Sequence, residues 1–176
     1  MCGLDGLHQC VFGRPVECGT FRESRPDYIQ NVTFRNCIVL ETPTLYDNKE
    51  GDEGWRGGCA AINARVGIYE GRGGGGRMSD ILFENIQIEN LYGGRPIAVE
   101  IVSDGKDTGS LSKVVFRNIT FTDDKYLPAQ VRRVSREFPL RNVVFDNVMF
   151  NGRQIKKADC RKYLFVNPYI ENLQFK

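Results

Sequence analysis

The sequence predicts an all-β protein, a right-handed parallel β-helix of about five rungs, because one line of sequence recurs at a spacing typical of a solenoid. The copies are "NVTFRNCIVLE", "DILFENIQIEN", "KVVFRNITFTD" and "NVVFDNVMFNG", and a shortened fifth copy, "NLQFK", ends the chain. Their aligned phenylalanines are separated by 49, 33, 29 and 30 residues. These phenylalanines are Phe34, Phe83, Phe116, Phe145 and Phe175.

The first element of each rung is a strand. Apolar and polar residues alternate in every copy, as Val32 and Phe34 do with Thr33 and Arg35. This period of two is that of a strand rather than a helix. We therefore expect the five phenylalanines to form one stack in the interior of the protein.

A bend is expected where each first strand ends, at the asparagine two positions after the phenylalanine. Asparagine tolerates the left-handed backbone of a sharp bend, and its amide can bond an equivalent asparagine on the next rung, about 4.8 Å away. A second short strand ("IVL", "IQI", "ITF" or "VMF") should follow the bend. The four asparagines of the expected ladder are Asn36, Asn85, Asn118 and Asn147.

A third strand follows in each rung after a looser connection. The runs are "CAAINARVGI" from Cys59, "PIAVEIVS" from Pro96 and "AQVRRVS" from Ala129. Three short strands per repeat, without a segment of helical period, are typical of a parallel β-helix. We expect one domain over residues 1–176, short or truncated for this fold, with a loop inserted at about 41–58 that lengthens the first gap.

Composition and charge exclude several classes of protein. The net charge is only +2, and nothing in the chain resembles a transmembrane segment or a charge block that would call for nucleic acid or lipid, so we expect neither membrane nor nucleic acid as a partner. The start, "MCGLDGLHQC", lacks the features of a signal peptide, which suggests a cytoplasmic protein or a piece of a longer one. The six cysteines lack paired metal-binding spacing, so we expect structural thiols, no metal site and no cofactor.

The stretch "ARVGIYEGRGGGGRMSDILFENIQIENLYGGRPIAVEI" resembles polygalacturonase-type enzymes of glycoside hydrolase family 28 and their pectin-degrading relatives. In those families an Arg-Ile-Lys strand precedes a Gly-Arg-Gly-Gly loop and an "I-x-F-E-N-I" rung. The ending, from "FDNVMFNGRQI" to "NPYIENLQFK", is similar to their last rung. The resemblance covers about two thirds of the chain and implies their β-helix, and relatives are usually secreted or periplasmic.

The family's catalytic motifs are not found where the family has them. Its catalytic aspartates lie in Asn-Thr-Asp and Asp-Asp motifs near a Gly-His-Gly, on rungs before the Arg-Ile-Lys strand, and none of the three occurs before Arg65 in this sequence. Arg65 matches the substrate-binding arginine, but Gly67 replaces the lysine. The resemblance therefore implies the C-terminal rungs of such an enzyme, or a relative that uses other residues.

Alternation on the third strands predicts a polar stripe outside the core. In the strand from Cys59, Asn63 and Arg65 should point outward, and Glu100 should do so on the next rung. If "GLHQCVFG" is the matching strand of the first rung, His8 lies on the same sheet.

Two unusual loops flank this strand, the insertion with "YDNKEGDEGW" and the glycine-rich "EGRGGGGR". Loops on a solenoid are common sites of binding and catalysis, and Trp55 could stack on a sugar ring. Hydrolysis of a glycosidic bond needs two carboxyl groups, about 5 to 5.5 Å apart for retention or about 6.5 to 9.5 Å for inversion. The candidate catalytic residues are Asp52, Glu53, Glu70 and Glu100, with Asp47 also available, and the candidate substrate-binding residues are Arg65, Asn63, Trp55, Arg72 and His8.

Two functions remain open from the sequence. The first is a carbohydrate-active protein that acts on a polysaccharide by hydrolysis, or a remnant of one. The second is a non-catalytic β-helix that serves as a binding or structural module, such as a segment of an adhesin or a tailspike. In either case we expect an oligosaccharide or polysaccharide as the partner. We also expect a homo-oligomer, because the end rungs of so short a solenoid leave strand edges unpaired.

Overall fold

The computed structural model describes residues 10–12, 16–20, 28–41, 60–67, 76–91, 94–102, 109–123, 126–133, 137 and 139–176. Strands dominate these residues. The elements are β1 (Cys10–Phe12), β2 (Val16–Thr20), β3 (Tyr28–Glu41), β4 (Ala60–Gly67), β5 (Arg77–Asn90), β6 (Arg95–Val102), β7 (Ser110–Phe121), β8 (Ala129–Arg133), β9 (Leu140–Phe150), β10 (Arg153–Gln154), the 3-10 helix η1 (Lys157–Asp159), β11 (Leu164–Val166) and β12 (Glu171–Phe175).

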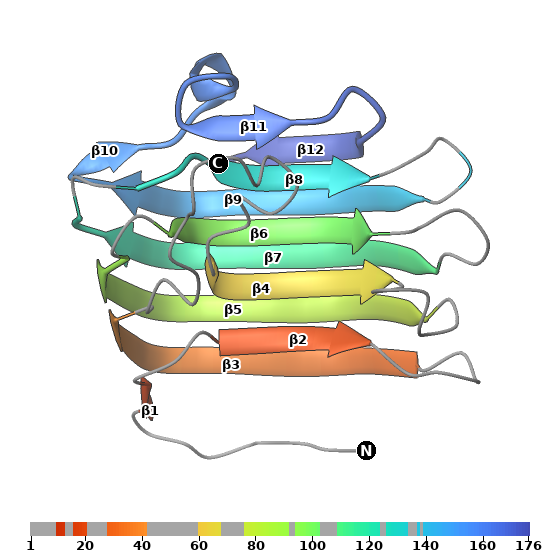
Figure 1. The fold of residues 1–176 in the computed structure, drawn as a ribbon, viewed down its shortest axis with the longest axis horizontal. Helices are drawn as coiled ribbons and strands as arrows, with labels where there is room; N and C mark the ends of the chain where they lie inside the picture. Colours follow the sequence, from red (N-terminus) through yellow and green to blue (C-terminus); the bar gives the residue numbers. More distant parts are fainter. Residues whose placement is uncertain are drawn as a thin grey trace, which may run out of the picture.

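The strands form two parallel sheets, and from β1 to β9 successive strands of the chain alternate between them (Figure 1). One sheet has the order β1-β3-β5-β7-β9-β10, with β12 also paired to β9, and the other has the order β11-β8-β6-β4-β2. Every pairing between the described strands is parallel except that of β10 with β9. The predicted all-β class with parallel strands is therefore confirmed, and the described part of residues 80–150 contains no helix.

The predicted phenylalanine stack is confirmed. Lateral pairing in the seven-stranded sheet places the five phenylalanines in register on successive strands. Neighbouring rings are nearly parallel. Their centroids are 5.2 Å apart in each of the three successive pairs that lead from Phe34 to Phe145, and 5.4 Å apart in the last pair, Phe145 and Phe175. Because the three central rings are buried, the stack is the main aromatic component of the core.

The asparagine ladder is also confirmed. All four residues have positive φ angles between 51° and 57°. Each amide nitrogen donates to the amide oxygen of the preceding rung, at 3.1 Å from Asn85 to Asn36 and at 2.9 Å from Asn118 to Asn85 and from Asn147 to Asn118. The strand continues through the bend, however. Each rung therefore has one long bent strand in this sheet, such as β3 or β5, rather than the two short strands predicted.

A second column of left-handed residues bends the same strands five positions earlier. It carries Asn31, Asp80, Lys113, Asn142 and Asn172, with φ angles between 54° and 59°. Polar contacts join its members, since Lys113 pairs with Asp80 at 2.9 Å and Asn172 donates to Asn142 at 2.7 Å. Asparagine and aspartate adopt this conformation more readily than most residues. Each long strand is thus bent at two points.

The third strands of the prediction correspond to β4, β6 and β8, which pair in that order in the five-stranded sheet. The prediction for "GLHQCVFG" was wrong. Cys10–Phe12 pairs with β3 in the seven-stranded sheet, whereas β2 is the neighbour of β4. The reason is that the short β1 continues the row of the long bent strands, with Cys10 in register with Cys37.

The core lies between the two sheets and draws on both. Phe83, Phe116 and Ile119 come from the seven-stranded sheet, while Ile62 and Val99 come from the five-stranded sheet, and all belong to one cluster of buried residues. At the C-terminal end, η1 and β11 follow the hairpin of β9 and β10 (Figure 1). In the described part of the chain, no helix has the length and apolar character needed to cross a membrane.

Candidate functional site

The candidate site lies on the face of the five-stranded sheet that points away from the core. In β4, Ile62, Ala64 and Val66 belong to the core cluster, so the intervening Asn63 and Arg65 lie on the opposite face. Pairing of the parallel strands then places Arg65, Glu100 and Arg132 in one lateral row across β4, β6 and β8. Three charged residues from successive rungs are thereby brought together.

Glu100 is the centre of this row. Its side chain is only 3% exposed, whereas those of Arg65 and Arg132 are 30% and 49% exposed. The Nη2 atom of Arg65 lies 2.8 Å from Oε2 of Glu100, and Nε of Arg132 lies 3.0 Å from Oε1. The side-chain amide of Gln130 also donates a hydrogen bond to Oε1. We call Arg65, Glu100, Gln130 and Arg132 the Glu100 cluster.

One buried oxygen beside the row has no donor among the described residues, whereas Oε2 of Glu100 is engaged by its ion pair with Arg65 at 2.8 Å. Asn63 is buried, and its Nδ2 donates to the carbonyl oxygen of Ala60 at 3.1 Å. Its Oδ1 has no donor within the described part of the chain. Buried acceptors of this kind are uncommon in folded proteins.

Arg95 adds positive charge at the start of β6. Its Nη1 donates to the carbonyl oxygen of Pro128 at 2.8 Å. Burial lowers the pKa of Arg95, the charge of Glu100 opposes this effect, and the charges of Arg132 and Arg65 add to it. Among the described residues, Glu100 thus interacts electrostatically with three arginines, Arg65, Arg132 and Arg95.

This arrangement suits binding of an anion better than acid–base catalysis. A glycosidase needs one carboxyl group that can donate a proton and a second that acts as base or nucleophile. Glu100 is the only carboxylate in the described row, and two arginines hold it. Guanidinium groups bind carboxylates through directed, charge-assisted hydrogen bonds. The accessible parts of Arg65 and Arg132 could therefore receive an acidic ligand while Glu100 keeps both side chains in place.

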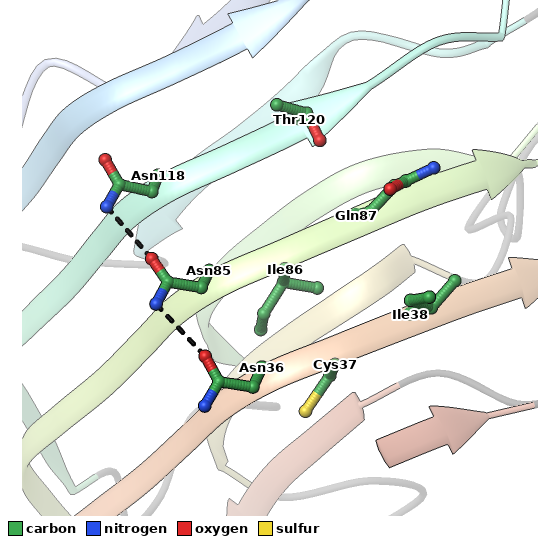
Figure 2. Close-up of a pocket in the computed structure, with 8 residues that line it drawn as sticks. All are labelled: Asn36, Cys37, Ile38, Asn85, Ile86, Gln87, Asn118 and Thr120. Atoms are coloured by element: carbon green, nitrogen blue, oxygen red, sulfur yellow. Dashed lines mark hydrogen bonds between the residues drawn. The ribbon is translucent and has the colours of Figure 1, made fainter. Parts of the chain in front are cut away.

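A shallow groove of about 430 Å³ lies on the other sheet, beside the asparagine ladder. Figure 2 shows the amides of Asn36, Asn85 and Asn118 in one column, with Gln87 and Thr120 further along the strands. Because the ladder amides bond one another, they contribute mainly to the alignment of the rungs. The groove lacks the charged and buried polar groups of the Glu100 cluster, so we do not assign the site to it.

Three sequence-predicted site residues are brought together in the structure, namely Asn63, Arg65 and Glu100. All three lie on the face of the sheet that points away from the core, as predicted. Asn63 and Glu100 are nevertheless buried rather than open to solvent. The remaining candidates lie outside the described residues: His8, Asp47, Asp52, Glu53, Trp55, Glu70 and Arg72.

Sequence reasoning missed Gln130, Arg132 and Arg95. The signal for the first two was present, because alternation in "AQVRRVS" places Gln130 and Arg132 on the outer face and repeat alignment places Arg132 beside Glu100. Arg95 had no such signal, since its position depends on its bond to Pro128.

Comparisons with family models, curated proteins and solved structures find no match to this chain. Among the described residues, no group of three or more histidine, cysteine, aspartate or glutamate side chains is arranged to hold a metal ion.

Proposed function

We propose that this chain forms a right-handed parallel β-helix that binds an acidic oligosaccharide on the outer face of its five-stranded sheet. The interleaved parallel sheets, the phenylalanine stack and the asparagine ladder support the β-helix, because one repeat of about 30 residues contributes one strand to each sheet. The sequence resemblance supports a relationship to polysaccharide-cleaving glycoside hydrolases of the polygalacturonase type.

The observation that carries the proposal is the pairing of two partly exposed arginines with one buried carboxylate. Glu100 fixes Arg65 and Arg132 on strands that both neighbour β6. Their remaining N–H groups can bind the carboxylate of a uronic acid, and the fixed geometry reduces the entropy that is lost on binding. Asn63 Oδ1 is buried and not exposed to a ligand, so recognition depends on the guanidinium groups of Arg65 and Arg132.

Hydrolysis by this site would require a second carboxyl group. The candidates are Asp52 and Glu53 in the insertion at about 41–58, and Glu70 in the glycine-rich loop "EGRGGGGR". The non-catalytic alternative is favoured by one specific observation, the engagement of Glu100 with two arginines and Gln130. Release of reducing ends from an acidic polysaccharide separates the two, because a binding module releases none.

Replacing Arg65 with alanine should weaken binding of a uronic acid trisaccharide by roughly tenfold or more, because a charge-assisted hydrogen bond contributes about 1.5–3 kcal/mol. Binding of the carboxyl-reduced form of the same trisaccharide should change by less than about threefold, because that ligand lacks the charge. Isothermal titration calorimetry with the two ligands measures both effects.

The matched control is Arg117→Ala. Arg117 is also a partly exposed arginine that pairs with carboxylates, those of Glu84 and Asp146, but it lies on the seven-stranded sheet. Its replacement should leave both affinities unchanged. Equal losses for the acidic and the neutral ligand in the Arg65 variant would show that Arg65 does not recognise a carboxylate.

A further inference from the structure

The C-terminal turn between β10 and β11 is strongly basic. Five of the eleven residues from Arg153 to Tyr163 are cationic and exposed, and the only acidic residue among them is buried. A surface turn of this charge attracts anions and repels cations at low salt. The exposed cations are Arg153, Lys156, Lys157, Arg161 and Lys162.

Asp159 organises this turn in the way that Glu100 organises its cluster. Its side chain is 4% exposed and lies 2.6 Å from Nη2 of Arg153, whose side chain is 59% exposed. The carboxylate also accepts a bond of 2.9 Å from the backbone N–H of Lys156. The backbone oxygen of Asp159 accepts bonds from the N–H groups of Lys162 and Tyr163. The basic side chains therefore extend from a turn whose backbone is held by hydrogen bonds.

Tyr163 lies at the centre of the positive charge. The Nζ atom of Lys162 is 4.8 Å from its ring centroid, and Cζ of Arg153 is 5.3 Å from the same centroid. A hydrogen bond with Lys162, together with the charges of Lys162 and Arg153, lowers the pKa of the Tyr163 phenol below its ordinary value. In contrast, burial raises the pKa of Tyr126. Lys162 and Arg153 thus act on the same phenol.

Arg161 occupies a backbone conformation that suits a smaller residue. Its φ angle is 90°, and its N–H donates to the carbonyl oxygen of Leu164 at 2.8 Å. Most other left-handed positions in this protein carry asparagine or aspartate. A long basic side chain at such a position is strained, and strained residues concentrate at functional sites.

The basic turn leads directly into the sheet that carries the Glu100 cluster. Tyr163 precedes β11, which pairs with β8 so that Phe165 lies in register with Gln130. Phe165 is 52% exposed. Its Cα lies one strand across and two residues along from the Cα of Arg132, a separation of roughly 8 Å. An exposed aromatic ring thus lies on the strand that follows the basic turn and pairs with β8 of the Glu100 cluster. Such a ring can serve as a platform for a sugar.

We propose that the basic turn is a second anion subsite, which together with the Glu100 cluster holds one long acidic polysaccharide along the C-terminal end of the five-stranded sheet. This inference rests on the proposed function and extends it from a short acidic sugar to a polymer. An acidic polysaccharide fits better than a nucleic acid, because the whole chain has a net charge of only +2 and a pI of about 8.2.

The test compares a polyuronate with a uronic acid trisaccharide on three proteins, by calorimetry at low salt. The first protein is the unmodified chain. The second carries Lys157→Gln, Arg161→Gly and Lys162→Gln, which remove three charges while glycine retains the conformation of residue 161. The third is a matched control with Arg77→Gln, Lys113→Asn and Arg141→Gln, which removes three exposed charges from the seven-stranded sheet.

We expect the unmodified protein to bind the polymer more tightly than the trisaccharide, with an affinity that falls as salt is raised. The turn variant should bind the polymer roughly tenfold more weakly and the trisaccharide equally well, and the control should match the unmodified protein for both. Circular dichroism confirms that both variants are folded. The same turn variant should also lose the lowered pKa of Tyr163 in an ultraviolet titration.

Each alternative result has a distinct meaning. Unchanged polymer binding in the turn variant overturns the second subsite and leaves the proposed function intact. Loss of polymer binding by the turn variant, with no trisaccharide binding by any protein, supports an anion site at the turn and contradicts the proposed function. Tighter binding of single-stranded DNA than of polyuronate overturns the assignment to a polysaccharide.

Discussion

Replacing Phe116 with alanine is expected to lower the free energy of unfolding by about 3–5 kcal/mol, the usual cost of truncating a buried aromatic residue. Phe116 is fully buried, and its ring stacks between those of Phe83 and Phe145 at 5.2 Å on each side. Alanine would leave a cavity between two rungs whose backbones are held apart at the strand spacing, so the neighbouring rings could not close it. Denaturation in urea or guanidinium chloride, followed by circular dichroism, measures the change.

Phe165→Ala provides the matched control. It removes the same side chain from a position that is about half exposed, on the outer face of β11. The expected cost is below about 1 kcal/mol, because little apolar surface returns to water. Similar losses at the two positions would contradict the interior stack, and a small loss at Phe116 would do so directly.

Replacing Glu100 with alanine is expected to lower the free energy of unfolding by about 2–3 kcal/mol. The change leaves Arg65 and Arg132 close together without the carboxylate that separates them, and it removes the acceptor of Gln130. The expected loss of unfolding free energy is smaller than the full cost of breaking a buried ion pair, because both arginines are partly exposed and can turn toward water.

Glu84→Ala is the corresponding control on the seven-stranded sheet. Glu84 pairs with Arg117 at 3.1 Å, but its side chain is more exposed than that of Glu100, and Arg117 retains Asp146 as a second partner. Its loss should cost less than about 1 kcal/mol. If Glu100→Ala proves no more costly than Glu84→Ala in equilibrium denaturation, Glu100 does not organise the cluster.

The phenylalanine stack and the asparagine ladder could be predicted because every copy of the repeat has the same residues at the same offsets. Identical offsets permit one superposition of the rungs, and this superposition fixes the lateral neighbours. The second column of bends was missed, although Asn31, Asp80, Asn142 and Asn172 each begin a copy. Lys113 interrupts that pattern, since lysine at a left-handed position is not expected from backbone preference.

The candidate site was predicted only in part, for a physical reason. Alternation along a strand shows which face of the sheet a residue occupies, and it placed Asn63, Arg65 and Glu100 on the outer face. It does not show whether that face is open to water, so the burial of Glu100 was missed. The positive charges of the basic turn are visible in "KKADCRK", but the order of the turn depends on the buried Asp159, which alternation along strands does not reveal.

The central claim is that the Glu100 cluster recognises a carboxylate on a sugar. The most direct test is the affinity of the unmodified protein for a uronic acid trisaccharide and for its carboxyl-reduced form, which differ only in that group. Two oriented arginines should make the acidic ligand bind at least about tenfold more tightly, and this preference should diminish as salt is raised. Equal affinities for the two ligands, or binding of neither, would contradict the claim.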